Sequence, residues 1–270
     1  MKLIIEPGRS ASQYWRELWH YRELLYFLAW RDLAVRYKQT VIGVAWALIR
    51  PALTMVVFVL FRRLMGAERS HVSDVLLVLS AVLPWQLFAN ALSESSTSLI
   101  NNTNLLSKVY FPRLIIPGAS VAAALVDFLI TLGLLAVVMM WQGFAPGWTL
   151  AALPVLVVAT LALSTGIGLF LAALNVQYRD FRYVVPFIIQ IGLFVSPIAF
   201  ASANVPERWK LLYSFNPLVG IIDGFRWSIL GAQTPLDMRA VTMSLVITVL
   251  SVCYGVWYFR RMERRFADVI

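Results

Sequence analysis

The sequence has few residues of the types that bind metals or form disulfides. It contains one cysteine, Cys253, and two histidines, His20 and His71, which are far apart in the chain. Cys253 lies in an apolar segment, so we expect neither a disulfide framework nor a thiolate metal site. A histidine metal site within one chain is not expected either. No cofactor or metal is therefore predicted in this chain.

Glycine-lysine pairs are also missing. The four lysines follow methionine, tyrosine, serine and tryptophan, whereas a P-loop needs a lysine directly after a glycine. If the protein is driven by ATP, a separate subunit must bind the nucleotide and its Mg²⁺. The N-terminus, MKLIIEPGRSASQ, lacks the apolar core of a secretory signal, so we expect the chain to enter the membrane through its first span.

Charged residues are scarce and apolar residues abundant. Charged residues make up 14% and hydrophobic residues 60% of the chain, with a mean hydropathy of +0.75, whereas soluble proteins have about 25% charged residues. This composition predicts a polytopic membrane protein in contact with lipids. The net charge of +9 could indicate nucleic-acid binding. Basic residues that flank apolar spans are typical of cytoplasmic membrane loops, so no nucleic-acid partner is expected.

Six segments are apolar over about the 20 residues that a membrane-spanning helix needs. An even number of spans places both termini on one side, and the positive-inside rule favours the cytoplasm, although Arg62, Arg63 and Arg69 then fall outside. The predicted fold is an all-α integral membrane protein with six transmembrane helices, N-in and C-in. The spans are 41–61, 74–93, 114–140, 149–174, 183–201 and 240–259.

Three polar segments flank or interrupt the spans. Residues 12–39 have the pattern of an amphipathic helix in the interface plane, which divides the chain into an interface region, 1–40, and a transmembrane domain, 41–270. This helix either anchors the N-terminus or also docks a partner. Residues 94–113 form either a solvated connector or a coupling element. Residues 202–231 are broken into short pieces, predicted to be re-entrant around a cavity.

Two charged residues fall inside predicted spans. Asp127 is midway along the third span, where we expect it to make a structural hydrogen bond rather than to relay protons. Arg50 lies about 13–14 Å along the first span, near mid-depth of a core about 30 Å thick, where a charge costs about 2.5–3.5 kcal/mol. Arg50 therefore either faces a channel or dimer interface, with Pro51 relaxing the helix, or pairs with Asp127.

Four stretches resemble one family. They are RDLAVRYKQTVIGVAWALIRPALTMVVF, LLSKVYFPRLIIP, LNVQYRDFRYVVPF and NPLVGIIDGFRWSILG. These stretches are similar to permease subunits of ABC-2-type polysaccharide exporters, most of all to Wzm-type O-antigen permeases, with KpsM-type capsule and teichoic-acid permeases as cousins. The resemblance implies a homodimer in the bacterial inner membrane that has no catalytic site of its own. Two copies of a cytoplasmic Wzt-type ATPase would bind ATP and Mg²⁺ and drive the export of a lipid-linked polysaccharide.

The resemblance also implies roles for single residues. Contacts to the ATPase are expected from Arg31, Asp32, Arg36, Tyr37, Lys38, Gln39, Asn101, Asn104, Lys108, Tyr110 and Pro112. The channel or substrate path is expected to include Trp46, Arg50, Trp85, Phe88 and Tyr183. Periplasmic gate helices between spans five and six are expected to present Trp209, Tyr213, Asn216, Pro217, Phe225 and Trp227. The family often has glutamine where this chain has Arg50, which would place a positive charge in or near the lumen.

Other functions fit the sequence less well. A second ABC-2 exporter class, for drugs or small lipids, would share the fold and differ in cargo. An integral-membrane glycosyl- or acyltransferase needs a carboxylate or histidine cluster, and Asp180, between Arg179 and Arg182, has no second carboxylate close by in sequence. A proton-coupled flippase would rest on Asp127 alone.

Overall fold

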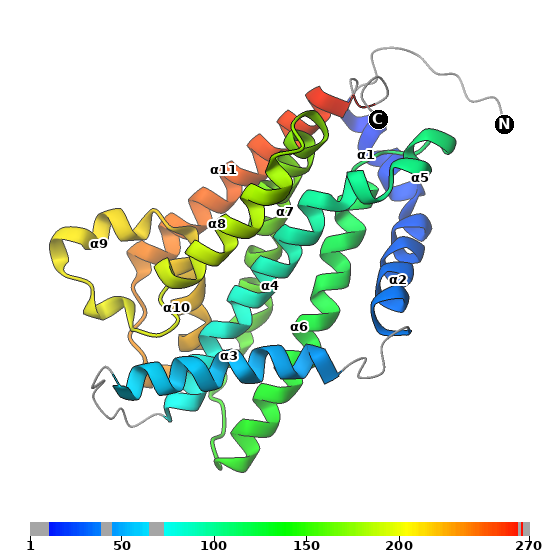
Figure 1. Ribbon diagram of the computed structural model, residues 1–270. Helices are drawn as coiled ribbons and strands as arrows, with labels where there is room; N and C mark the ends of the chain where they lie inside the picture. The colour runs from blue at the N-terminus through cyan, green and yellow to red at the C-terminus, as the bar shows by residue number, and fades with distance from the viewer. Residues whose placement is uncertain (1–10, 39–44, 65–72, 264–265, 267–270) are drawn as a thin grey trace.

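The computed structural model describes residues 11–38, 45–64, 73–263 and 266, and every regular element in these ranges is a helix (Figure 1). The predicted all-α class is therefore confirmed for this part of the chain. Five helices are long and apolar enough to cross a membrane. They are α3 (Ala45–Leu64), α4 (Asp74–Asn101), α6 (Ile115–Trp141), α7 (Leu153–Gln177), which follows the 3₁₀ helix η1 (Trp148–Ala152), and α11 (Met238–Glu263).

The predicted fifth span, 183–201, is shorter than expected. It corresponds to α8 (Phe181–Val195), with 15 residues, which is about 22 Å of helix against a hydrocarbon core of about 30 Å. The helix ends at Val195 because Ser196 precedes Pro197, and a residue before proline is driven to extended backbone. Ser196 has that conformation, with φ −85° and ψ 152°. Six full-length spans are thus not found among the described helices.

The centre of the bundle is α4, which contacts α3, α6, α7, α8 and α10 (Pro217–Leu230). Small residues bring α7 and α11 close together. A Cβ atom added at Gly255 of α11 would lie 2.0 Å from the carbonyl oxygen of Gly166 in α7. The backbones of these two helices therefore touch, as small residues allow between membrane helices.

The N-terminal segment forms two helices, α1 (Ala11–His20) and α2 (Arg22–Lys38), rather than one. We predicted that it lies in the interface plane, but α2 instead packs along α6. Leu25 lies beside Gly118, and Arg36 binds Asp127, so the two helices run parallel. The reason is that α2 buries Leu28 in a cluster with residues of α6.

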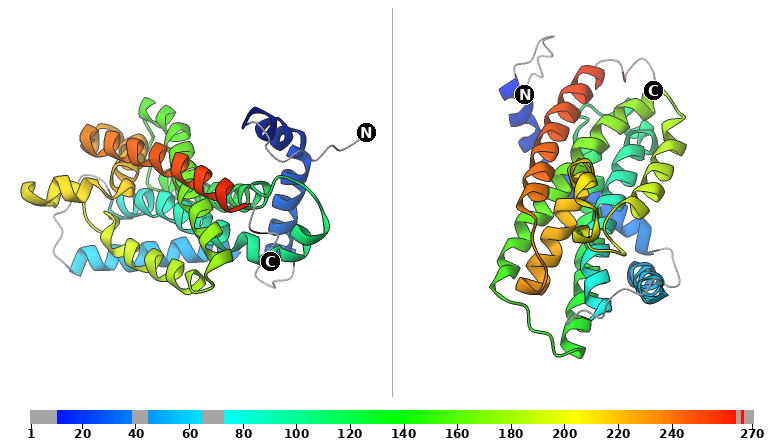
Figure 2. Two further views of the ribbon diagram at one scale, coloured as in Figure 1. Left: turned by 90° about the horizontal axis from the view of Figure 1, so that it is seen from above. Right: turned by 90° about the vertical axis from the view of Figure 1, so that its left-hand side faces the viewer.

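The first predicted span, α3, has an orientation that the hydropathy pattern does not predict. Figure 1 shows α3 lying across the long axes of α4 and α6, and the right-hand view of Figure 2 looks along α3. Pro51, Phe58 and Val59 of α3 are buried. Phe58 and Val59 pack into the core cluster to which α4 contributes the most residues, and this packing holds α3 in its orientation. Much of the remaining α3 surface is exposed.

The other polar segments resolve into short helices. Residues 94–101 continue α4 to its end at Asn101, and the predicted helical core is α5 (Thr103–Lys108). Residues 202–231 hold η2 (Ser202–Asn204), α9 (Glu207–Ser214) and α10, and η3 (Gly231–Gln233) follows from Gly231. The breaks fall at Pro206 and Asn216, the N-cap residues of α9 and α10, and the Asn216 side chain accepts a hydrogen bond from the Leu218 amide at 3.1 Å.

Candidate functional site

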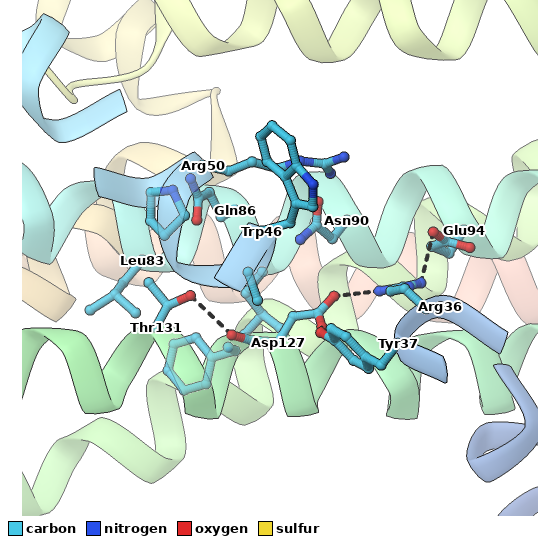
Figure 3. A pocket seen from close by; sticks show the side chains of 14 residues that line it. Arg36, Tyr37, Trp46, Arg50, Leu83, Gln86, Asn90, Glu94, Asp127 and Thr131 are labelled. Carbon is cyan, nitrogen blue, oxygen red and sulfur yellow. Dashed lines mark hydrogen bonds and ion pairs between the residues drawn. The ribbon is translucent and has the colours of Figure 1, made fainter. Parts of the chain in front are cut away.

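A polar cavity of about 460 Å³ lies where the end of α2 meets α3, α4 and α6 (Figure 3). Its lining comes from four helices between residues 36 and 131, and it combines charged, amide and aromatic side chains. The lining residues are Arg36, Tyr37, Trp46, Ala47, Arg50, Pro51, Leu83, Gln86, Leu87, Asn90, Glu94, Asp127, Phe128 and Thr131.

Helical periodicity places these side chains together. Residues four apart on a helix share a face, so α3 presents Trp46 with Arg50, and α4 presents Gln86 with Asn90. In α6, Asp127 and Thr131 have the same spacing, and the Thr131 hydroxyl donates to the Asp127 carbonyl oxygen at 2.9 Å. Each helix therefore directs a polar pair to the cavity.

One end of the cavity holds a connected ion-pair network. The Arg36 guanidinium binds the Asp127 carboxylate through Nη1 and Glu94 Oε1 through Nη2, the latter at 2.9 Å. The Tyr37 hydroxyl donates to Asp127 Oδ1. Burial and then the Asp127 carboxylate raise the pKa of Tyr37 to about 12. The Tyr37 hydroxyl therefore stays protonated and acts as the hydrogen-bond donor to Asp127. The Asp127 side chain is only 13% exposed, and its carboxylate is bound by the Arg36 guanidinium and the Tyr37 hydroxyl. This agrees with the structural hydrogen bond expected for Asp127.

Arg50 does not pair with Asp127, so that alternative is wrong. The partners of Asp127 come from α2, which reaches it because α2 runs parallel to α6. Arg50 itself is exposed, and within the described part of the chain no carboxylate forms an ion pair with it. Figure 3 shows Arg50 and Trp46 extending from α3 beside Gln86 and Asn90.

The residues expected to contact an ATPase do not share one environment. Arg31 donates to Asp32 and to Asn102 Oδ1, each at 2.7 Å, so the predicted coupling segments of α2 and of 101–112 touch each other. Arg36 and Tyr37 line the cavity instead. The side chains of Lys38, Asn101, Asn104, Lys108 and Tyr110 are exposed, Pro112 is buried, and Gln39 lies outside the described residues.

The residues expected in the channel are not all brought together. Trp46 and Arg50 share the cavity. Trp85 and Phe88 are core residues, 4% and 7% exposed, with ring centroids 6.0 Å apart. Tyr183 is exposed on α8. Within one chain, core packing therefore accounts for Trp85 and Phe88.

The residues expected at the gate lie around a buried arginine that the sequence reading missed. Arg226 of α10 donates to the carbonyl oxygens of Leu77, Ile198 and Phe200 at 3.0–3.3 Å. Burial lowers the pKa of Arg226 to about 10, which leaves it charged, and Asp223 lies 3.8 Å away. The signal was present, because Asp223 and Arg226 are three residues apart on a short helix.

Around Arg226, the predicted residues occupy different environments. Phe225 is fully buried, and Trp227 packs edge-on against Trp148 at 6.0 Å. Trp209 is exposed, Tyr213, Asn216 and Pro217 are partly buried, and burial followed by the Asp223 charge raises the pKa of the Tyr213 phenol.

Comparison with known proteins identifies the family to which this chain belongs. The ABC-2 type transporter family matches residues 23–230, which run from α2 to the end of α10 and include every residue that lines the cavity. This chain belongs to the ABC-2 type transporter family. It is therefore a multi-pass membrane protein of a transporter family, in agreement with its apolar helices.

Two relatives match this ABC-2 chain over most of its length. The O-antigen export system permease protein RfbA of Klebsiella pneumoniae is 26% identical over 250 residues, covering 92% of this chain and 95% of that protein. The protein of the same name from Myxococcus xanthus is 27% identical over 258 residues, covering 94% and 98%.

Proposed function

We propose that this ABC-2 protein is the permease subunit of an exporter that moves a lipid-linked polysaccharide of the O-antigen type across the bacterial inner membrane. The observation that supports this most is the similarity, over more than nine-tenths of the chain, to permeases named for O-antigen export. The protein acts as a homodimer, in which the exposed faces of α3 and α8 provide apolar and aromatic surface for a second copy and for the passing polymer. The short helices α9 and α10 act as the outer gate.

Energy comes from a separate Wzt-type ATPase, one copy docked on each permease, which holds ATP and Mg²⁺. The docking surface is built from the α2 residues around Arg31 and from α5. The hydrogen bond from Arg31 to Asn102, the N-cap residue of α5, connects these two elements, so a displacement of one moves the other. Because Arg36 on the same helix binds Asp127 and Glu94, movement of α2 shifts the cavity wall.

The test is export in cells that carry the permease with its ATPase partner. Scrambling residues 103–108, or changing Arg31 and Asn102 together to alanine, should reduce surface polysaccharide strongly while the permease remains in the membrane. Arg239→Ala is a matched control, since Arg239 is exposed at the start of α11. Normal surface polysaccharide in the scrambled variant would contradict the coupling role, and intact surface polysaccharide after deletion of the permease would contradict the function.

A further inference from the structure

The two cations of the cavity differ in what surrounds them. Arg36 is shared by two carboxylates, Asp127 and Glu94, so its end of the cavity has an excess of negative charge. Arg50 has no carboxylate partner within the described part of the chain. The cavity is therefore polarised, with a net negative end formed by Arg36, Asp127 and Glu94 and an unpaired positive charge at α3.

Two amide side chains next to Arg50 are also without partners. Gln86 and Asn90 of α4 line the cavity beside it (Figure 3), and neither side-chain amide forms a hydrogen bond with another described residue. Both side chains are partly buried and open into the cavity, so their hydrogen-bonding groups are available to a ligand. One cation and two amide N–H donors thus converge on one space, and all three can donate hydrogen bonds to the same group.

We propose that Arg50, Gln86 and Asn90 form a subsite for an anionic oxygen group of the exported molecule. A guanidinium binds phosphate or carboxylate through two parallel N–H donors, and the amides supply further donors. The shared chemistry is an anionic oxygen cluster, which either the phosphate of a lipid carrier or the carboxylate of an acidic sugar can provide. The inference rests on the proposed function only in taking this ligand to be part of the cargo.

The remaining cavity wall supports this orientation of the ligand. Asp127 and Glu94 repel an anion, which keeps the anionic group at the Arg50 end. The exposed Trp46 ring stands one helical turn from Arg50 on the same face of α3, where it can pack against the apolar face of an attached sugar. A single uncompensated arginine gives moderate affinity, which suits a site that must release its ligand.

The test measures binding to the full-length permease in lipid nanodiscs without nucleotide. The probes are farnesyl pyrophosphate, a trigalacturonate and the neutral trisaccharide maltotriose. We expect wild-type protein to bind at least one anionic probe, and Arg50→Gln to bind that probe about 10- to 100-fold more weakly. Arg50→Lys should lie between the two, and Arg239→Gln, which changes an exposed arginine at the start of α11, should bind as wild type. Loss of pyrophosphate binding identifies the carrier phosphate, and loss of galacturonate binding identifies an acidic sugar.

Two results would overturn the subsite. One is equal binding of both anionic probes by wild type and Arg50→Gln, and the other is wild-type protein that binds maltotriose as well as the anions. If Arg50→Gln fails to fold, Gln86→Leu combined with Asn90→Leu removes the other two donors of the subsite and should weaken anion binding without affecting Arg36. If the wild-type protein exports polysaccharide but Arg50→Gln binds anions as tightly as wild type, only the subsite is refuted. If anion binding depends on Arg50 but the wild-type protein exports no polysaccharide, only the proposed function is refuted.

Discussion

The ion-pair network that joins α2 to the bundle can be tested by a double-mutant cycle. Arg36→Met leaves the Asp127 carboxylate, 13% exposed, with the Tyr37 hydroxyl as its side-chain partner. Breaking a fully buried pair costs about 3–5 kcal/mol, and an exposed pair about 0–1 kcal/mol. Arg36 is 28% exposed, so we expect a loss of about 2–3 kcal/mol. Asp127→Leu should lose less, about 1–2 kcal/mol, because Arg36 keeps Glu94.

The double variant should lose less than the sum of the single ones, since neither residue then leaves an uncompensated charge behind. Thermal unfolding in detergent is the assay, where about 1 kcal/mol corresponds to about 2–4 °C in Tm. Arg208→Met is the control, because it removes an exposed arginine outside the network. Strict additivity, or shifts for both single variants as small as that of the control, would refute the conclusion that this network holds α2 in place.

Two further predictions concern packing and the α10 region. Gly255→Leu should prevent α7 and α11 from packing together, because even a Cβ atom would overlap the Gly166 carbonyl oxygen. Size-exclusion chromatography should then show a loss of folded protein. Gly133→Ala, where a Cβ atom meets open space, is the control and should fold normally. Arg226→Met removes the Arg226 donor from three carbonyl oxygens, of which that of Ile198 is buried, and leaves the buried Asp223 carboxylate without its cation. We expect it to destabilise by about 3–5 kcal/mol. Limited proteolysis should then cleave residues 196–206 faster. Unchanged cleavage would contradict the conclusion that Arg226 holds this segment through the Ile198 and Phe200 carbonyl oxygens.

Breaks in the helices could be predicted where their causes are local. Pro206 and the pair Asn216-Pro217 set helix starts by backbone chemistry that depends only on neighbouring residues, and the structure has N-caps at these positions. The end of α8 could also have been read from Ser196-Pro197. It was missed because an apolar run was extended through the proline.

The polar half of α4 could not be predicted, because it depends on tertiary packing. Ser95, Ser96 and Ser98 suggest a loop by composition, yet all three are buried. The Ser98 hydroxyl donates to the Ser95 carbonyl oxygen at 2.7 Å, and Asn175 of α7 donates to the Ser96 carbonyl oxygen at 3.0 Å. Serines that bond back to their own helix are compatible with burial, but the sequence does not reveal which helix covers them.

The site shows the same division between local and tertiary causes. Hydropathy was enough to infer that Asp127 must be bonded. The expected depth of Arg50 assumed that α3 runs along the other spans, whereas α3 lies across α4 and α6 (Figure 1). Trp46 and Arg50, which the resemblance places together on the substrate path, both line the cavity. The partners of Asp127 could not be predicted, and pairing with Arg50 was only one of two alternatives. Arg36 and Tyr37 reach Asp127 because α2 lies along α6, and the apolar pattern of residues 22–38 fits an interfacial helix equally well.

The position of α2 gives the proposed transport cycle a short mechanical path. Arg31, which reaches the α4–α5 junction, and Arg36, which holds the cavity wall, are five residues apart on one helix, or about 7.5 Å at 1.5 Å per residue. A continuous helix is rigid over that length, so displacement at the docking surface is transmitted to Asp127 and Glu94 without an intervening hinge. Arg50 is on a different helix and outside this network. Movement of α2 therefore changes the distance between the acidic end of the cavity and the open cation, which alters the field on a bound anion.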